Sequence, residues 1–246
     1  MRCFLGLIKP HSGTCEIHGE ESWNASPEAR QKIGFVPQQF DSFMWMTVDQ
    51  ILDYTGAFYH KWQSSYVDKL NRRFGLGGEE IIADLSVGMQ QRVSIVMALG
   101  HRPDLLVLDE PVAALDPVGR RTFIELLLDI HINEGKTIIF STHITSDIER
   151  VAARVAMMKE GQIVIHSDIE DLKETYCRVH LHSQKEIETL LADVPGCLKR
   201  ELQTHSARLV LENMDESWFQ KMSNTSGVQV ELEHLNLDEI FLALNT

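Results

Sequence analysis

The sequence predicts an α/β protein with a mostly parallel sheet core, a helical subdomain and a small C-terminal α+β domain. Apolar runs such as Leu105–Leu108 and Thr137–Phe140 have the composition of buried parallel strands, and helical patterns separate them. Both runs end in polar residues, which places those residues at the carboxyl edge of a sheet, where open α/β folds bind ligands. We therefore expect one domain over residues 1–167, with the helical subdomain at about 40–100, and an accessory domain over 168–246.

The expected helical subdomain follows a short strand that ends at Val36. Thr47 with Gln50 three residues later resembles a capping box at the start of its first helix. A second helix is expected over Ser64–Phe74, where the following glycines end it, and a third over about 86–99.

The second half of the main domain alternates helix and strand. Asp116 followed by Pro117 fits a helix N-cap with proline at the first helical position, and the helix continues to Ile130. Thr137–Ser141 is rich in β-branched residues and predicts a strand. His143 then lies at the carboxyl end of that strand.

The C-terminal domain is expected to have a βαββαβ order, as in ferredoxin-like and similar small α+β modules. Asn236, with Glu239 three residues on, can cap a final helix after it. The expected elements are strand Tyr176–His182, helix Gln184–Ala192, strands on either side of His205-Ser206, helix Met214–Met222 and strand Val228–Glu233.

Composition and charge exclude several classes of protein. No apolar run approaches the roughly 20 residues of a membrane span, and Met1 begins no signal peptide. The four cysteines are far apart in the sequence, which suggests neither a disulfide framework nor a zinc site and favours a reducing compartment. A formal net charge of −13 opposes attraction to phosphate backbones, so we expect no nucleic-acid partner.

Five short motifs occur in a fixed order along the chain. They are Ile33–Gln38, Leu85–Arg92, Leu105–Pro111, Ala114–Asp116 and Ser141–His143. Together they resemble the glutamine loop, signature sequence, Walker B strand, D-loop and switch histidine of an ABC-family ATPase. Each motif also falls in the structural context that such a match requires.

The resemblance implies a fold and a chemistry. The fold is the ABC-type nucleotide-binding domain, and the reaction is hydrolysis of ATP with Mg²⁺ as cofactor. Asp109 would hold Mg²⁺, with Gln38 approaching the same metal and the attacking water. Glu110 would orient or deprotonate that water, and His143 would bond the γ-phosphate or the water.

The resemblance also implies residues that act across a dimer. In the family, two domains pair head to tail, and the signature of one closes on the nucleotide of the other. Ser86, Gly88 and Met89 belong to this signature, although Val87 and Met89 replace a glycine and a glutamine of the family's L-S-G-G-Q. Asp116 would communicate across the dimer, and it is also the helix cap described above.

The phosphate loop G-x-x-x-x-G-K-[ST] appears nowhere in the 246 residues. We therefore expect the chain to be truncated at its N-terminus, starting a few residues after the lysine of that loop. Without the lysine, the β- and γ-phosphates lose a cation and a cradle of amides, so the chain alone is predicted to be inactive.

The function expected is that of the ATP-hydrolysing subunit of an ABC exporter, at the inner face of the cell membrane in the cytoplasm. Leu237–Leu244 is similar to the closing segment of ABC-2-type exporter subunits. Aromatic residues gathered between Phe35 and Trp62 adjoin the glutamine loop and suggest docking to a membrane permease. Two alternatives remain: a non-hydrolysing relic that lends its signature to an intact partner, and a soluble ABC ATPase of translation or DNA maintenance.

Overall fold

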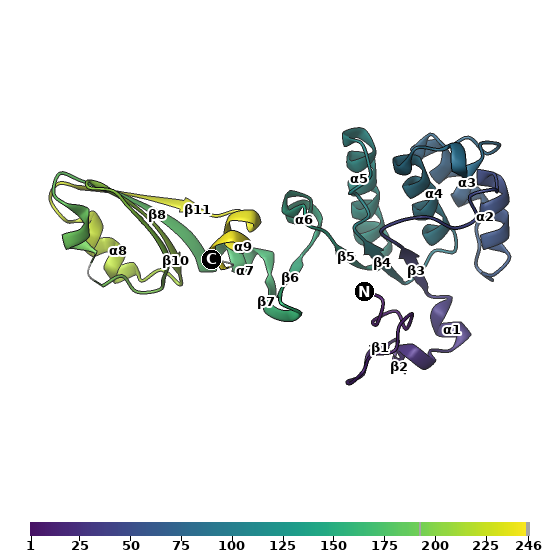
Figure 1. Cartoon of the computed structure of the whole chain (residues 1–246), viewed down its shortest axis with the longest axis horizontal. Helices are drawn as coiled ribbons and strands as arrows, with labels where there is room; N and C mark the ends of the chain where they lie inside the picture. The colour runs from purple at the N-terminus through teal and green to yellow at the C-terminus, as the bar shows by residue number, and fades with distance from the viewer. Residues whose placement is uncertain (192, 245–246) are drawn as a thin grey trace. The chain divides into compact units, whose positions relative to one another are not determined.

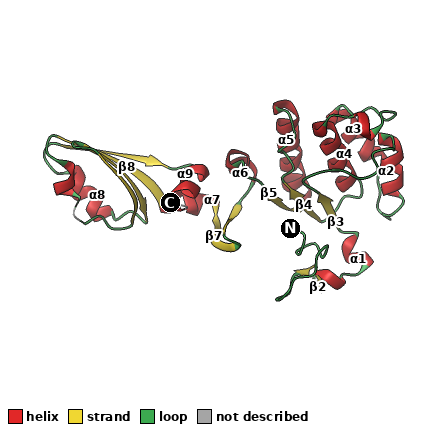
Figure 2. Cartoon of the chain, viewed as in Figure 1, coloured by secondary structure: helices red, strands yellow, loops and turns green. Residues whose placement is uncertain are grey.

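A computed structural model describes residues 1–191 and 193–244 of the chain (Figure 1). Their contacts separate two units, Met1–His143 (unit 1) and Ile144–Thr246 (unit 2). Figure 2 shows that unit 1 combines several helices with short strands, whereas much of unit 2 consists of strands. The two units are therefore built on different sheets, and each is described by itself.

The core of unit 1 is a three-stranded parallel sheet in the order β3-β4-β5. These strands are β3 (Ile33–Val36), β4 (Leu105–Asp109) and β5 (Thr137–Ser141). The central strand β4 is buried from Leu105 to Leu108, with the exposed fraction of each side chain between 0% and 7%. Burial on both faces explains why β4 reads as a continuous apolar run, as predicted.

Four long helices of unit 1 begin and end with the signals that the sequence contains. They are α2 (Val48–Gly56), α3 (Ser64–Phe74), α4 (Val87–Leu99) and α5 (Pro117–Glu134). Thr47 and Gln50 form the reciprocal capping box, and Gly75 ends α3 in the left-handed conformation. Asp116 caps α5 by accepting a hydrogen bond from the Gly119 N–H. The local helix signals are thus confirmed.

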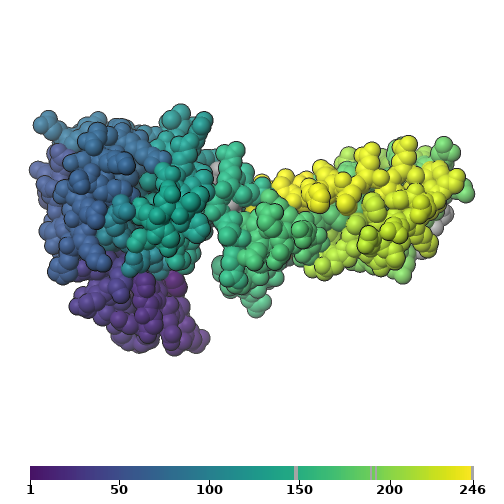
Figure 3. Space-filling view, turned by 180° about the vertical axis from the view of Figure 1, so that it is seen from behind, coloured from purple at the N-terminus to yellow at the C-terminus, as the bar shows by residue number. Residues whose placement is uncertain are grey.

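The two faces of the parallel sheet are covered differently (Figure 1). Helices α4 and α5 lie on one side, and α4 approaches β3 so closely that a Cβ at Gly34 would collide with the carbonyl oxygen of Ala98. The N-terminal segment covers the other side, where Ile17 packs against Leu105 and Val107. It includes β1 (Glu16–Ile17), β2 (Glu20–Glu21), η1 (Ser22–Asn24) and α1 (Pro27–Arg30), and Figure 3 shows it in purple at one side of unit 1.

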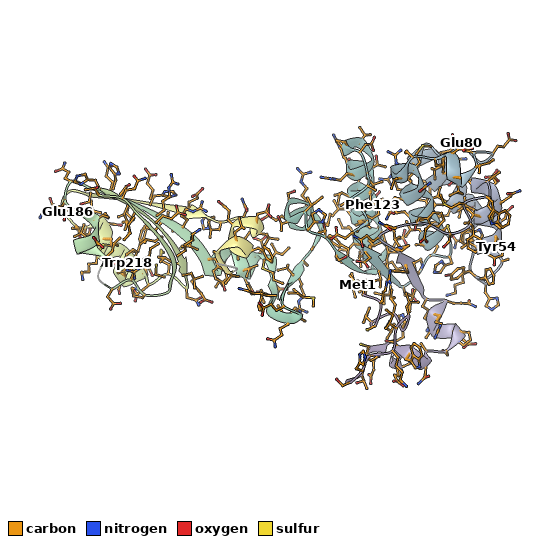
Figure 4. All side chains as sticks on the ribbon, in the orientation of Figure 1. Met1, Tyr54, Glu80, Phe123, Glu186 and Trp218 are labelled. Carbon is orange, nitrogen blue, oxygen red and sulfur yellow. The ribbon has the colours of Figure 1, made fainter. Side chains whose placement is uncertain are left out.

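Unit 2 contains a four-stranded antiparallel sheet in the order β11-β8-β10-β9. With β8 as the first strand and β11 as the fourth, this is the order 4-1-3-2 of the predicted βαββαβ module. Its elements are β8 (Tyr176–Ser183), η3 (Ile187–Leu190), β9 (Cys197–Leu202), β10 (Ser206–Glu212), α8 (Glu216–Ser223) and β11 (Val228–His234). Trp218 on α8 packs against the buried face of the sheet (Figure 4).

One predicted helix of unit 2 is wrong in type and length. The segment expected to be a helix over 184–192 contains the short 3-10 helix η3, and residue 192 lies outside the described residues. The Ser183 hydroxyl accepts the Lys185 N–H, which forms a tight turn directly after β8. Pro195 disfavours helical backbone just beyond η3, so a full α-helix has little room.

The segment just after unit 1 packs with the C-terminal helix. Val155, Met157, Ile169, Leu237 and Ile240 share one buried cluster. The contacts therefore divide the chain after residue 143, whereas the sequence placed a domain boundary after 167. The elements concerned are α6 (Thr145–Val151), β6 (Arg154–Lys159), β7 (Gln162–Asp168), α7 (Ile169–Thr175) and α9 (Leu237–Leu244).

The final helix α9 begins at the predicted cap. The Asn236 Oδ1 accepts the Glu239 N–H at 3.0 Å, and the Glu239 carboxylate accepts the Asn236 N–H at 3.0 Å. Within the described part of the chain, no helix combines the length and apolar character needed to cross a membrane.

A buried histidine lies beside β3 in unit 1. His101 is 2% exposed, and its ring stacks on Tyr59 with 3.8 Å between ring centroids. Its Nε2 donates to the carbonyl oxygen of Ile33 at 3.2 Å. Burial lowers the pKa of His101 from 6.5 to about 4, so the folded protein holds a neutral imidazole over most of the acidic range.

We expect the stability of unit 1 to fall by about 2 kcal/mol between pH 7.5 and pH 5 because of His101. Below pH 6.5 the imidazole binds a proton in the unfolded chain, whereas in the folded chain it stays neutral until about pH 4. Proton binding therefore stabilises the unfolded state as the pH falls. Urea unfolding followed by pulsed hydrogen exchange of α4 peptides measures this. The His101→Gln variant should lose that pH dependence, and an equal slope in both proteins would contradict the assignment.

Candidate functional site

Two carboxylates lie at the carboxyl end of β4, where the sequence predicted them. The parallel register places Asp109 beside Ser141 of β5. The Ser141 hydroxyl donates to Asp109 Oδ1 at 2.6 Å, and the Glu110 N–H donates to Ser141 Oγ at 3.1 Å. The same Glu110 N–H also donates to the carbonyl oxygen of Ser141 at 3.2 Å. The acid pair is therefore fastened to the neighbouring strand.

The predicted catalytic residues Glu110 and His143 are in direct contact. His143 Nδ1 lies 2.7 Å from Glu110 Oε2. Their side chains differ in exposure, at 19% for Glu110 and 70% for His143. Glu110 has a φ of 51°, a left-handed conformation that non-glycine residues rarely adopt and that often occurs at functional sites. The backbone at Glu110 thus turns sharply where the strand ends.

Gln38 lies close to the same edge. It follows β3 by two residues and, together with Asp109, Arg2 and Ser94, lines a cleft of about 620 Å³. A carboxylate oxygen and an amide oxygen fit Mg²⁺, which keeps several waters and takes few protein ligands. Among the described residues no group of three His, Cys, Asp or Glu side chains forms a metal cage. Asp109 and Gln38 therefore fit a Mg²⁺ ion that keeps waters in its other positions.

The signature residues lie at the start of α4. Ser86 is the N-cap, and its hydroxyl accepts the Met89 N–H at 3.3 Å. A Cβ on Gly88 would come within 2.8 Å of the Ala114 carbonyl oxygen, so this glycine allows the signature to lie against the D-loop. Val87, which replaces a family glycine, is 67% exposed. The signature and the D-loop are thus neighbours within unit 1.

The last two residues of the signature motif, Gln91 and Arg92, make contacts that the sequence interpretation missed. Gln91 is 2% exposed, and its Nε2 donates to the carbonyl oxygen of Pro37 at 3.3 Å, directly before Gln38. Arg92 donates to the Phe74 carbonyl at 3.0 Å and to Asp116 Oδ1 at 2.6 Å. The sequence did contain a signal for these contacts, because polar residues precede the apolar run of α4.

Asp116 therefore has two partners. The Gly119 N–H and the Arg92 guanidinium lower the pKa of its carboxyl group. Its predicted role as a helix cap is confirmed, and the same oxygen that caps α5 also bonds Arg92 of α4. Asp116 thus joins the D-loop to the signature helix.

Comparisons with known proteins identify the family of the chain. The ABC transporter family matches residues 1–113. The uncharacterised ABC transporter ATP-binding protein YxlF of Bacillus subtilis is 31% identical over 179 residues, covering 71% of this chain and 58% of that protein. The methionine import ATP-binding protein MetN of Protochlamydia amoebophila is 34% identical over 181 residues, covering 70% and 53%. The bacitracin transport ATP-binding protein BcrA of Bacillus licheniformis is 32% identical over 176 residues, covering 71% and 58%.

The chain thus spans between 53% and 58% of the length of these three relatives. It also aligns over 98% of its own length with 92% of the ABC transporter ATP-binding protein BpOF4_11395 of Alkalihalophilus pseudofirmus, at 26% identity. The truncation predicted from the sequence is not supported by that alignment.

Solved structures show the same fold. An ATP-binding subunit of an ABC transporter superposes with a TM-score of 0.62 at 25% identity, covering 70% of this chain and 74% of that one. The dimeric bacterial ABC transporter cassette MJ0796 gives 0.61 at 25% identity, covering 68% and 78%. The parallel sheet, its helices and the acidic edge at β4 therefore define an ABC ATPase fold. The chain belongs to the ABC transporter ATP-binding proteins.

We expect Arg92→Met to destabilise unit 1 by about 1–3 kcal/mol, because the Phe74 carbonyl and the Asp116 carboxylate lose their shared donor. Arg121→Met is the matched control, since Arg121 is 82% exposed and pairs with Glu125 within α5. That change should cost less than about 0.5 kcal/mol. Urea unfolding followed by hydrogen exchange of α4 measures the free energy of unfolding of both variants. Equal decreases would show that the Arg92 hydrogen bonds do not stabilise unit 1 more than an exposed ion pair does.

Proposed function

We propose that the chain is the ATP-binding and ATP-hydrolysing subunit of an ABC transporter. The observation that carries this proposal is the contact of 2.7 Å between Glu110 and His143, beside Asp109 at the carboxyl edge of the parallel sheet. A water-activating carboxylate, a metal-binding carboxylate and a hydrogen-bonding imidazole at one edge are the groups that phosphoryl transfer to water requires.

Each residue at this edge has a distinct proposed role. Bound Mg²⁺-ATP would supply the electrophilic γ-phosphate and a cation that offsets its charge. Asp109 and Gln38 are the proposed metal-side residues, and Gln38 also contacts the water. Glu110 orients the water and accepts its proton, which is general base catalysis. His143, already hydrogen bonded to Glu110, donates to the γ-phosphate or to the water.

The proposed assembly is a head-to-tail dimer of ATPase domains. Ser86, Gly88 and Met89 would approach the nucleotide of the partner, since a hydroxyl, backbone amides and the N-terminus of α4 all favour an anion. Asp116 would carry the signal across the dimer, and its bond to Arg92 links it to the signature helix. The dimeric cassette MJ0796 has the same fold and supports this arrangement.

An exposed aromatic surface supports docking to a permease. It consists of Phe43, Trp45, Tyr54 and Phe58, with exposed fractions of 39%, 73%, 43% and 62%. The ring centroid of Tyr54 lies 5.1 Å from the ring centroid of Phe43 and 5.1 Å from that of Phe58. Figure 4 shows Tyr54 at the outer edge of unit 1. Clustered exposed aromatics are typical of interfaces, so this surface would hold the chain to membrane subunits at the cytoplasmic face.

Export is the proposed direction of transport. Its support is the segment Leu237–Leu244, which resembles the closing segment of ABC-2-type exporter subunits and forms helix α9 in unit 2. In inside-out vesicles the cytoplasmic face of the membrane points outward, so an exporter is expected to accumulate the transported substrate inside the vesicles when ATP is added outside.

We expect Trp45→Ala to weaken co-purification with the permease about tenfold or more, because Trp45 is the most exposed aromatic of this surface, at 73%, and tryptophan contributes heavily to interfaces. Ile132→Ala is the control, since Ile132 is 71% exposed on α5 in the same unit. Affinity purification of the tagged chain from membranes, with the permease quantified, measures both. Unchanged recovery for Trp45→Ala would eliminate the aromatic surface as the docking site.

In an assembled transporter whose ATPase subunit carries a G-x-x-x-x-G-K-[ST] loop ahead of these 246 residues, we expect Glu110→Gln to lower ATP turnover by at least about 100-fold, because the general base is lost. The matched control is Glu125→Gln on the exposed side of α5, which should leave turnover unchanged. Phosphate release in reconstituted vesicles is the measurement. Equal turnover in both variants would refute the proposed catalytic role.

The 246 residues assayed alone are expected to show no Mg²⁺-dependent turnover, since their sequence contains no G-x-x-x-x-G-K-[ST]. The assay is phosphate release from the isolated chain. A turnover that disappears in Glu110→Gln would show that this phosphate loop is not needed, and would contradict the expectation.

A further inference from the structure

We infer that Ser141 is a positioning residue that sets both acids of the site, Asp109 and Glu110, through one hydroxyl group. This inference rests on the proposed function, because it concerns the metal and water residues of ATP hydrolysis. The hydroxyl donates its hydrogen to Asp109 Oδ1 at 2.6 Å and accepts the Glu110 N–H at 3.1 Å.

The sheet itself brings Ser141 to this place. Ser141 is the last residue of β5, and the parallel register makes it the direct neighbour of Asp109, the last residue of β4. A shift of one residue would turn the side chain to the other face of the sheet. The hydroxyl therefore reaches the acids only in the register that the buried strands β4 and β5 adopt.

For Asp109, the hydroxyl decides which oxygen is presented to a cation. A carboxylate rotates as a rigid group, so fixing Oδ1 on Ser141 also fixes the direction of Oδ2. A serine hydroxyl has a single hydrogen, and a distance of 2.6 Å is that of a charge-assisted bond to an ionised carboxylate. Outer partners of this kind orient metal ligands and commonly change metal affinity by about 10–100-fold.

For Glu110, the same oxygen stabilises an unusual backbone. Glu110 has a φ of 51°, and such a conformation persists only where its surroundings hold it. The Ser141 Oγ and the Ser141 carbonyl oxygen both accept the Glu110 N–H. That turn directs the Glu110 side chain to His143, at 2.7 Å. The Ser141 side chain thus contacts Asp109 and Glu110 directly, and Glu110 in turn contacts His143.

The test compares Ser141→Thr with Ser141→Val in the full chain. These variants have the same shape and strand propensity, and they differ in the hydroxyl alone. Mn²⁺ without nucleotide is the probe, and its paramagnetic broadening of backbone amide signals near Asp109 and Gln38 is followed by nuclear magnetic resonance. Ser141→Ala repeats the comparison without the branched side chain if the valine variant does not fold.

We expect wild type and Ser141→Thr to broaden at similar Mn²⁺ concentrations, and Ser141→Val to need about tenfold more. A purely structural role would not separate the two variants once both are folded. Equal Mn²⁺ dependence in the threonine and valine variants, with normal binding in wild type, would overturn the inference and leave the proposed function intact. No selective broadening in wild type would overturn the metal site, and with it both proposals.

Discussion

The pairing of β4 with β5 is the constraint on which the rest of the candidate site depends. Because the strands are parallel, their carboxyl ends meet at one edge, and the register places Asp109 beside Ser141. Residues that follow the strands, Glu110 and His143, then come within hydrogen-bond distance although 33 positions separate them in the sequence. The apolar residues of β4 contribute no chemistry, but their burial maintains the register that brings the polar residues together.

Helix α4 adds a second level of organisation, since a single helix contacts both the D-loop and the loop that contains Gln38. Its first turn carries the signature, with Gly88 against Ala114 of the D-loop. Gln91 bonds the carbonyl of Pro37 ahead of Gln38, and Arg92 bonds Asp116. Packed cores respond to displacement as units rather than by continuous deformation. A movement of α4 would therefore displace both the loop of Gln38 and Asp116.

How much of this could be predicted depends on how far apart the partners lie in the sequence. The caps at Thr47 and Asp116 need residues three positions away, so they were found correctly. The bonds of Arg92 to Asp116 and of Ser141 to Asp109 span 24 and 32 positions, and they exist only once the sheet has formed. Motif order therefore located the acids, but it could not show what holds them. The packing of the segment after residue 143 could not be found from motif order for a similar reason, because its apolar partners include Leu237 and Ile240.

The edge of the sheet combines anchored and exposed groups, and this division suits its proposed chemistry. Asp109 and Glu110 are bound to Ser141, which limits the reorganisation needed when charge develops on a phosphate. The His143 side chain is 70% exposed, and its hydrogen bond to the Glu110 carboxylate keeps it at the site. If a phosphate offers His143 a stronger acceptor, the imidazole can exchange partners while the acids stay in place. The site can then respond to nucleotide through its histidine without losing the geometry of its metal and water residues.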